Sequence, residues 1–249
     1  MDYNAFKEMF GGNSSWAVWA KPEKGNWSSK DSIADLDCVW CGGDEYKSID
    51  DYAKERFNNI KDVKYVFVGL NPSDHNCDNC SYTHIDKCED NNRKQKAKEK
   101  GKELWSNFHS ACTIKSQDYK LRKALYDTDY WGSFITDIKP DVETDSNKIS
   151  TTPTEKSIKM VNSIISLFGE KITFIAIGSK SCTILQKILP ENVNLKKITH
   201  YSYRSLSPDN YVTRVKNDLN NIITKRITRG YEKLEKSVAK LIEKYEDVE

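Results

Sequence analysis

Three short apolar runs, each ending on glycine, proline or polar residues, constrain the fold of this chain more than any other feature. They cover residues 65–69 (YVFVG), 132–140 (GSFITDIKP) and 171–178 (KITFIAIG). Short runs rich in β-branched and aromatic residues are typical of strands buried on both faces. A fourth, shorter strand is expected within 195–205 (LKKITHYSYRS).

Segments with helical spacing of apolar residues separate these runs. The clearest covers 154–170, where Val161, Ile164 and Phe168 fall on one face and Gly169 stops the helix. Further helices are expected in 48–60, in 118–132 with an end near Asp127, in 179–189 and in 207–226. Strands that alternate with helices predict an α/β fold whose parallel sheet is covered by helices on both faces.

The expected organisation is one domain over residues 1–228, with a polar Cys/Lys-rich insertion at about 74–104, and a C-terminal helix over 229–249. Tryptophans at 16, 19, 27 and 40 predict an irregular, aromatic-rich N-terminal segment. From Tyr231 to Val248 the apolar residues recur at spacings of 3, 4, 3, 4 and 3, which fits a short coiled coil. This helix would either pack on its own domain or bind a partner, such as a second copy in a homodimer.

Composition narrows the class of protein. Charged residues make up 31% of the chain and hydrophobic ones 37%. No apolar run approaches the roughly 20 residues of a membrane span, and the N-terminus lacks the pattern of a secretory signal. We therefore expect a cytoplasmic protein with no membrane partner.

The net charge of +2 neither requires nor excludes a nucleic-acid partner. The run 93–102 (RKQKAKEKGK), with six basic residues and one acidic, is either a solvated segment or a phosphate-contacting arm.

Polar residues or glycine follow each expected strand. Asn71, Asp137, Gly178 and His200 come at or just after the four strand ends. In open α/β sheets, ligands bind beyond the carboxyl ends of the strands. The sequence therefore predicts that these four residues gather at one edge of the sheet.

The ordered set VGLNPS (68–73), FITDIKP (134–140), FIAIG (174–178) and THYSYRS (199–205) resembles the uracil-DNA glycosylase superfamily. The first motif is most similar to the branch of mismatch-specific and thymine-DNA glycosylases, where it has the form Gly-Ile-Asn-Pro. The resemblance covers about residues 64–225. It implies a three-layer α/β/α fold with a four-stranded parallel sheet, and a base-flipping enzyme that hydrolyses an N-glycosidic bond.

The resemblance also implies roles for individual residues. Asn71 falls at the water-positioning site and His200 at the histidine of the second motif, which stabilises the leaving base. Asp137 falls where the family usually has an Asn that reads the base edge. The remaining candidates for substrate binding are Gly69, Leu70, Pro72, Ser73, His109, Ser202, Tyr203 and Arg204, the last at the place of an intercalating Leu.

Two positions depart from the family pattern. Asp137 replaces an amide that both donates and accepts, whereas an ionised carboxylate only accepts. It would favour a base that offers an amino group, or it would bind a metal or a ribose hydroxyl. Tyr201 stands where the family commonly has Pro. These departures favour a second hypothesis, a catalytically inactive module that binds a nucleobase, a nucleotide or nucleic acid, with DNA expected before RNA.

A third hypothesis is a protein-interaction role in which the charged insertion and the terminal helix matter more than the pocket. The pairing of Asn71 with His200 favours the enzyme over both alternatives.

Two Cys-x-x-Cys pairs, Cys38 with Cys41 and Cys77 with Cys80, could supply four thiolates to one structural zinc. Alternatively, the segment 75–88 (HNCDNCSYTHIDKC) could hold a metal by itself, or the thiols could be free. Some members of the superfamily carry an iron–sulfur cluster, but their Cys spacing does not match this sequence.

Overall fold

The computed structural model describes residues 1–19, 38–71, 105, 108, 117–139, 146–203, 205–221 and 223. These residues form a five-stranded sheet, a two-stranded hairpin and six α-helices. The sheet has the order β1-β5-β4-β6-β7, with β1 (Ser14–Trp16), β4 (Tyr65–Gly69), β5 (Phe134–Asp137), β6 (Thr173–Ile177) and β7 (Asn194–Ile198). The four strands predicted from the sequence are all present, and they pair in parallel.

The predicted four-stranded parallel sheet was nevertheless incomplete, because β1 extends it as a fifth, antiparallel strand beside β5. This pairing places the buried Ser14 opposite Thr136, and the Ser14 hydroxyl donates to Thr136 Oγ1 at 2.7 Å. A strand of three residues, Ser-Ser-Trp, carries no periodicity from which it could be recognised. The sheet is therefore mixed and mostly parallel.

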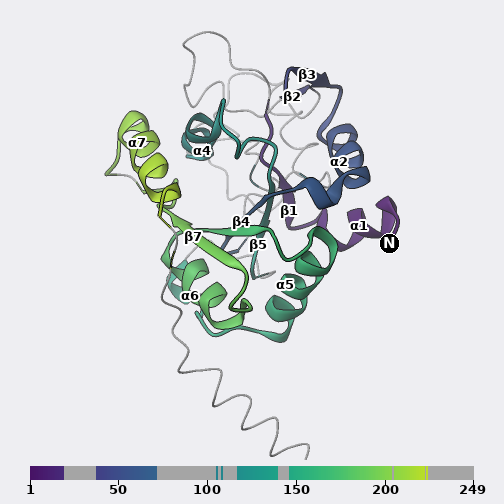
Figure 1. The fold of residues 1–249 in the computed structure, drawn as a ribbon. Coiled ribbons are helices and arrows are strands. Elements are labelled where there is room, and N and C mark those ends of the chain that lie inside the picture. The colour runs from purple at the N-terminus through teal and green to yellow at the C-terminus, as the bar shows by residue number, and fades with distance from the viewer. Residues whose placement is uncertain are drawn as a thin grey trace, which may run out of the picture.

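Helices lie on both faces of this sheet (Figure 1). On one face, α5 (Glu155–Phe168) and α6 (Ser179–Ile188) pack against the strands, and Thr136 Oγ1 lies 3.8 Å from Met160 Sδ of α5. On the other face, α4 (Asp118–Leu125) packs against α7 (Pro208–Leu219), which also covers β7. Helices on both faces leave only the ends and edges of the strands open to a ligand.

Helix boundaries follow local chemistry. Thr154 caps α5 by accepting from Ser157 N–H, and Gly169 ends it at a φ of 97°. Ser48 caps α2 (Ile49–Asn58) in the same way, and η1 (Ile60–Asp62) follows. The helix expected to reach Asp127 ends at Leu125, because Tyr126 leaves the helical region with φ −56° and ψ 135°. A short η2 (Ser146–Lys148) precedes α5.

An aromatic layer joins the N-terminal segment to the sheet. The Phe6 ring of α1 (Tyr3–Phe10) lies 5.5 Å from Trp105, 6.0 Å from Phe134 and 6.5 Å from Phe168, between ring centroids. Trp16 and Trp19 are also fully buried. The predicted aromatic-rich N-terminal segment is confirmed for the part of the chain that the structure describes; Trp27 lies outside it.

A hairpin of β2 (Val39–Cys41) and β3 (Asp44–Tyr46) turns through Gly42 and Gly43, both at positive φ. Among the described residues, no helix is long and apolar enough to span a membrane. The insertion predicted at about 74–104 and the helix predicted over 229–249 both lie outside the described residues. These two predictions stay untested, and so do the domain limits and the homodimer that depend on them.

Candidate functional site

The carboxyl ends of β4 and β5 form one corner of the candidate site. Gly69 and Asp137 are register partners, and Asp137 is only 2% exposed. A Cβ on Gly69 would overlap Oδ1 of Asp137, so the carboxylate folds back against the glycine. The two chains stay paired beyond the strands, because Ile138 N–H donates to Gly69 O and Lys139 N–H to Leu70 O. This pairing fixes where Asp137 sits on the edge.

Asn71 and Leu70 follow β4 directly. Asn71 is half-buried at the end of the strand, where the sequence predicted it. Leu70 is 8% exposed, and its side chain belongs to the hydrophobic core, so a ligand could reach only its main chain. Pro72, Ser73, His109 and Arg204 lie outside the described residues, and their predicted roles stay predictions.

Phe108 is a site residue that sequence reasoning missed. Its ring atoms lie 3.1 Å from the position that a Cβ on Gly69 would take, beside the Asp137 carboxylate. The backbone of Phe108 is at a φ of 66°, in the left-handed region. The sequence favoured its neighbour His109. Nothing in the segment LWSNFHSA distinguishes the two, because the approach to Gly69 is a tertiary contact.

The ends of β6 and β7 form the second corner. Gly178 follows β6 at a φ of 89° and donates its N–H to Ile198 O at 2.9 Å. His200 lies against it: a Cβ on Gly178 would be 3.4 Å from His200 Cβ and 3.5 Å from Cδ2. The imidazole also contacts the Tyr201 ring, with centroids 4.4 Å apart and planes inclined by 30°. The sequence prediction that His200 and Gly178 meet at this edge is confirmed.

Hydrogen bonding defines the protonation of His200. The Ser202 N–H, which can only donate, points to His200 Nδ1 at 3.1 Å, and Ser202 Oγ lies 2.8 Å from the same atom. Nδ1 is therefore an acceptor, and the ring proton is on Nε2. Burial lowers the pKa of His200 to about 4. Near neutral pH the imidazole is thus uncharged and offers one N–H donor from Nε2.

Tyr201 connects the two corners electrostatically. Burial raises the pKa of its hydroxyl, and the negative charges of Asp137 and Asp118 raise it further. Asp118 is 4% exposed, at the start of α4. Neighbouring strands lie roughly 4.8 Å apart, so three intervals separate Asp137 on β5 from His200 on β7 by about 14 Å between main chains. A ligand at this edge would be contacted from two sides.

Hydrogen bonds from α7 and α4 hold the loop that carries His200. Asp218 Oδ2 accepts from both N and Oγ1 of Thr199 at 2.9 Å, and Tyr211 donates its hydroxyl to Thr199 O at 3.0 Å. Lys120 of α4 donates from Nζ to Leu206 O at 2.9 Å and to Tyr203 O at 3.4 Å. Tyr203 itself is 56% exposed, so its ring is open to a partner.

Cys38 precedes β2 and Cys41 is its last residue; both are half-buried thiols. Cys38 donates to Glu45 Oε1 at 2.9 Å, and Cys41 lies 3.6 Å from the Tyr52 hydroxyl. Burial raises the pKa of the Cys41 thiol. Cys77 and Cys80 lie outside the described residues, so the four-Cys zinc site is untested. Within the described part of the chain, no three His, Cys, Asp or Glu side chains are grouped as metal ligands.

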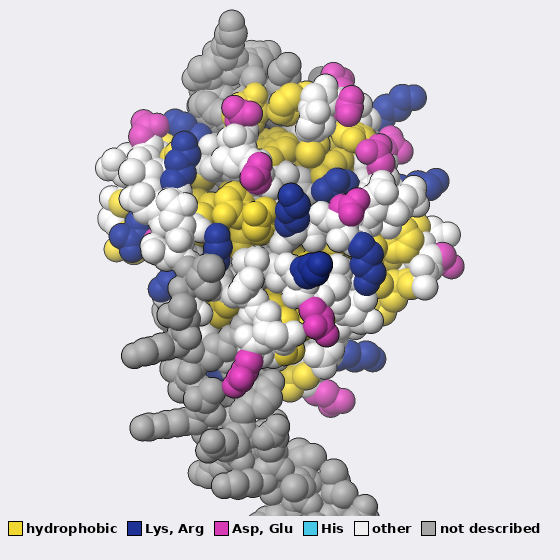
Figure 2. Space-filling view, in the orientation of Figure 1, with side chains coloured by type: hydrophobic (Ala, Val, Ile, Leu, Met, Phe, Trp, Pro, Cys, Tyr) yellow, Lys and Arg dark blue, Asp and Glu magenta, His cyan; other side chains and the backbone are white. Residues whose placement is uncertain are grey.

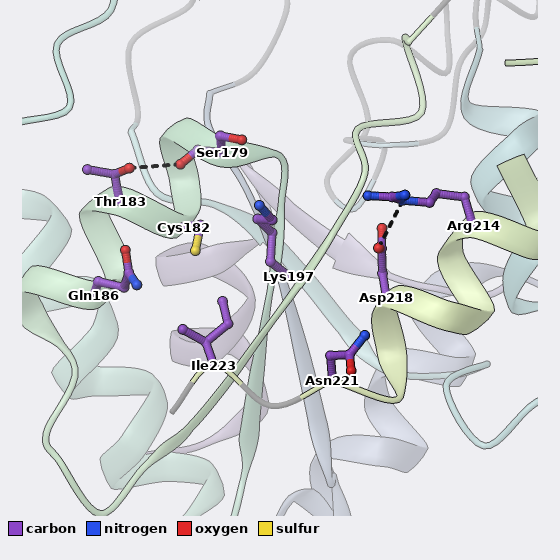
Figure 3. Close-up of a pocket in the computed structure, with 9 residues that line it drawn as sticks. All are labelled: Ser179, Cys182, Thr183, Gln186, Lys197, Arg214, Asp218, Asn221 and Ile223. Atoms are coloured by element: carbon purple, nitrogen blue, oxygen red, sulfur yellow. Dashed lines mark hydrogen bonds and ion pairs between the residues drawn. The ribbon is translucent and has the colours of Figure 1, made fainter. Parts of the chain in front are cut away.

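A separate pocket opens at the outer edge of β7 (Figure 3). Its cavity has a volume of about 460 Å³ and lies between α6, β7 and α7. It is lined by Ser179, Cys182, Thr183, Gln186, Lys197, Arg214, Asp218, Asn221 and Ile223. The lining has two cationic side chains, Lys197 and Arg214. Arg214 Nε pairs with Asp218 Oδ1 at 3.1 Å, so the charge of Arg214 is offset. The lining does not include Asn71, Asp137 or His200, and the sequence did not predict this pocket.

Charge is mixed on the face seen in Figure 2, where Lys and Arg alternate with Asp and Glu. This agrees with the net charge of +2.

Comparisons of the chain with models of known protein families, with curated proteins and with solved structures found no match. The function therefore has to be argued from the geometry of the site.

Proposed function

We propose that this chain is a DNA glycosylase-like hydrolase that cleaves the N-glycosidic bond of a flipped or single-stranded base. The observation that carries the proposal is the neutral His200, whose Nδ1 accepts from Ser202 N–H and whose ring proton therefore lies on Nε2, at the carboxyl edge of the sheet. Loss of a base leaves negative charge on the base and an oxocarbenium-like sugar. A positioned donor aimed at such developing charge contributes about 3–4 kcal/mol to transition-state stabilisation.

A neutral imidazole suits this task. It donates a hydrogen bond to the leaving base without transferring a full proton, and its pKa of about 4 keeps it neutral at physiological pH. Asn71, at the end of β4 and two strands away from the His200 loop in the sheet, would hold the attacking water through its amide oxygen. An amide cannot deprotonate that water, but a dissociative reaction requires little more than its orientation.

The enzyme must first extract the base from the stack, which costs a few kcal/mol. Two aromatic rings support this step. Phe108 lies beside Asp137, and a flipped base could stack on its ring. Tyr203 is 56% exposed on the His200 loop and could fill the gap that the base leaves. The expected partner is therefore DNA, in single-stranded or locally opened form.

Asp137 points to the class of base. A carboxylate only accepts hydrogen bonds, so it pairs with an exocyclic amino group or a ring N–H rather than with a carbonyl. In this proposal the base presents an amino group to Asp137 and a carbonyl to His200. Replacement by Asn should then shift preference toward uracil, whose edge needs both a donor and an acceptor.

The second candidate function is a binding module of the same fold without catalysis. It is favoured by the burial of Asp137 at 2% exposure and by the bulky Tyr201 ring against His200. Such a module would retain a nucleobase, a nucleotide or a strand and release it unchanged.

One assay separates the two. The protein is incubated with oligonucleotides that carry cytosine, uracil, hypoxanthine, xanthine or mismatches, and abasic sites are cleaved with alkali. The hydrolase should produce strand breaks with at least one substrate, and Asn71→Ala and His200→Ala should each reduce them by 10²-fold or more, by roughly 3 kcal/mol. The exposed Asn220→Ala is the matched control. Folded protein that binds these strands but yields no abasic sites would support the binding module instead.

A further inference from the structure

Two lysines near the candidate site are almost fully buried. Lys120 is 3% exposed and Lys139 is 4% exposed. Lysine is rarely buried to this extent unless it is paired, because removing an ammonium group from water costs several kcal/mol. Both amines contact main-chain carbonyls: Lys139 donates to Thr152 O at 2.7 Å, and Lys120 donates to Leu206 O and Tyr203 O. Each lysine therefore fixes a loop.

The loop that Lys120 fixes is the one that carries His200. Its N-terminal end, Thr199, is already held by Asp218 and Tyr211 of α7. Farther along the loop, the carbonyls of Tyr203 and Leu206 accept from Lys120 of α4. Between these anchors the turn closes on itself, because Tyr203 N–H donates to His200 O at 3.1 Å.

The burial of Lys120 has a measurable consequence in its own titration. Desolvation lowers the pKa of Lys120. An uncharged carbonyl accepts less strongly than a carboxylate, so the two carbonyl contacts offset only part of the cost of burying the amine. The neighbouring Lys123, by contrast, pairs with Asp209 at 2.6 Å in a partly exposed ion pair.

We propose that Lys120 is a positioning residue, which holds the carbonyls of Tyr203 and Leu206 so that Ser202 N–H stays on His200 Nδ1 and the ring presents Nε2–H to the ligand. Lys120 does not itself contact His200 in this proposal. It acts through the carbonyls of Tyr203 and Leu206 and through the turn that the Tyr203 N–H closes on His200 O. The catalytic consequence rests on the proposed function, but the positioning of His200 does not.

The test uses the full chain and reads the His200 imidazole directly. NMR titration of the ring protons follows the four histidines, and His200→Gln identifies the signal of His200. In the wild type His200 should titrate near 4. In Lys120→Met, which keeps the length of the side chain but removes its donors, water should reach the ring and the Ser202 hydrogen bond should loosen. The pKa should then rise by about one unit or more toward 6.5.

Lys139→Met is the matched control, since it also removes a buried ammonium from a main-chain carbonyl but on a different loop. It should lose stability to a similar extent while the pKa of His200 stays where it is. If Lys120→Met does not fold, Lys120→Leu, which also lacks a donor, is read in the same way. An unchanged His200 pKa in a folded Lys120 variant, or an equal rise in Lys139→Met, would overturn the inference.

Activity gives a separate readout. If the wild type forms abasic sites, Lys120→Met should lower kcat by about tenfold or more with little change in KM, as expected when only transition-state stabilisation is lost. If the wild type forms none, the proposed function fails, and the pKa comparison still decides whether Lys120 positions His200.

Discussion

Replacing Gly69 by Ala should destabilise the protein mainly through one contact, with Asp137, since the next nearest atoms, of the Phe108 ring, lie 3.1 Å from the new Cβ. The new Cβ would overlap Oδ1 of Asp137, which is 2% exposed and has little room to move. Overpacking in a well-packed interior costs about 1–3 kcal/mol. Displacing the buried carboxylate from its present surroundings adds about 1 kcal/mol or more. We therefore expect Gly69→Ala to lower the free energy of unfolding by about 2–4 kcal/mol.

This cost can be traced to its cause by a double-mutant cycle. Asp137→Ala removes the carboxylate, so Gly69→Ala should cost at least about 1 kcal/mol less in that background than in the wild type. Urea denaturation followed by circular dichroism gives each free energy, and the melting temperature of Gly69→Ala should fall by about 4–16 °C for a chain of this size. Gly12→Ala is the control, because its Cβ would meet nothing within 4 Å.

Two results would refute this reasoning. A Gly69→Ala variant within about 0.5 kcal/mol of the wild type would mean that the carboxylate does not lie against the glycine. An unchanged cost in the Asp137→Ala background would place the strain elsewhere. Either result would also remove Asp137 from the position on which the argument about the base depends.

Two further predictions concern protonation and metal. Because the pKa of His200 falls from about 6.5 in the unfolded chain to about 4 in the folded one, protonation favours unfolding. Stability should fall as pH drops from about 6.5 to 4, and His200→Gln should show a shallower loss in urea titrations across that window; equal slopes would contradict the burial of the ring. Elemental analysis of protein purified without a metal-affinity tag should find about one zinc per chain, lost in Cys38→Ser and in Cys77→Ser; metal-free folded wild type would end the zinc prediction.

Much of the fold could be predicted because its signals are local. The strands β4 and β5 are short apolar runs that end on Gly69 and Asp137, and β6 is one that Gly178 follows directly. β1 could not be predicted, since three residues give no period and its partner β5 lies 120 positions away. The pairing of Ser14 with Thr136 is fixed only by the tertiary fold.

The site was predicted in part for the same reason. Strand ends of a parallel sheet meet at one edge, so the sequence could place Asp137 and His200 there together. It could not show that Phe108 reaches Gly69, because that contact depends on the path of a long segment. Nor could it show that Lys120 is buried, since a lysine on an amphipathic helix is ordinarily expected in water.

The central claim is that His200 donates from Nε2 to a departing base while Asn71 holds the attacking water. The most direct measurement is the formation of alkali-labile sites in oligonucleotides by wild type, Asn71→Ala, His200→Ala and Asn220→Ala side by side. The account predicts breaks with the wild type and with Asn220→Ala, and at least a 10²-fold loss in the other two variants. No breaks from folded wild type on any base, or full activity in His200→Ala, would contradict it.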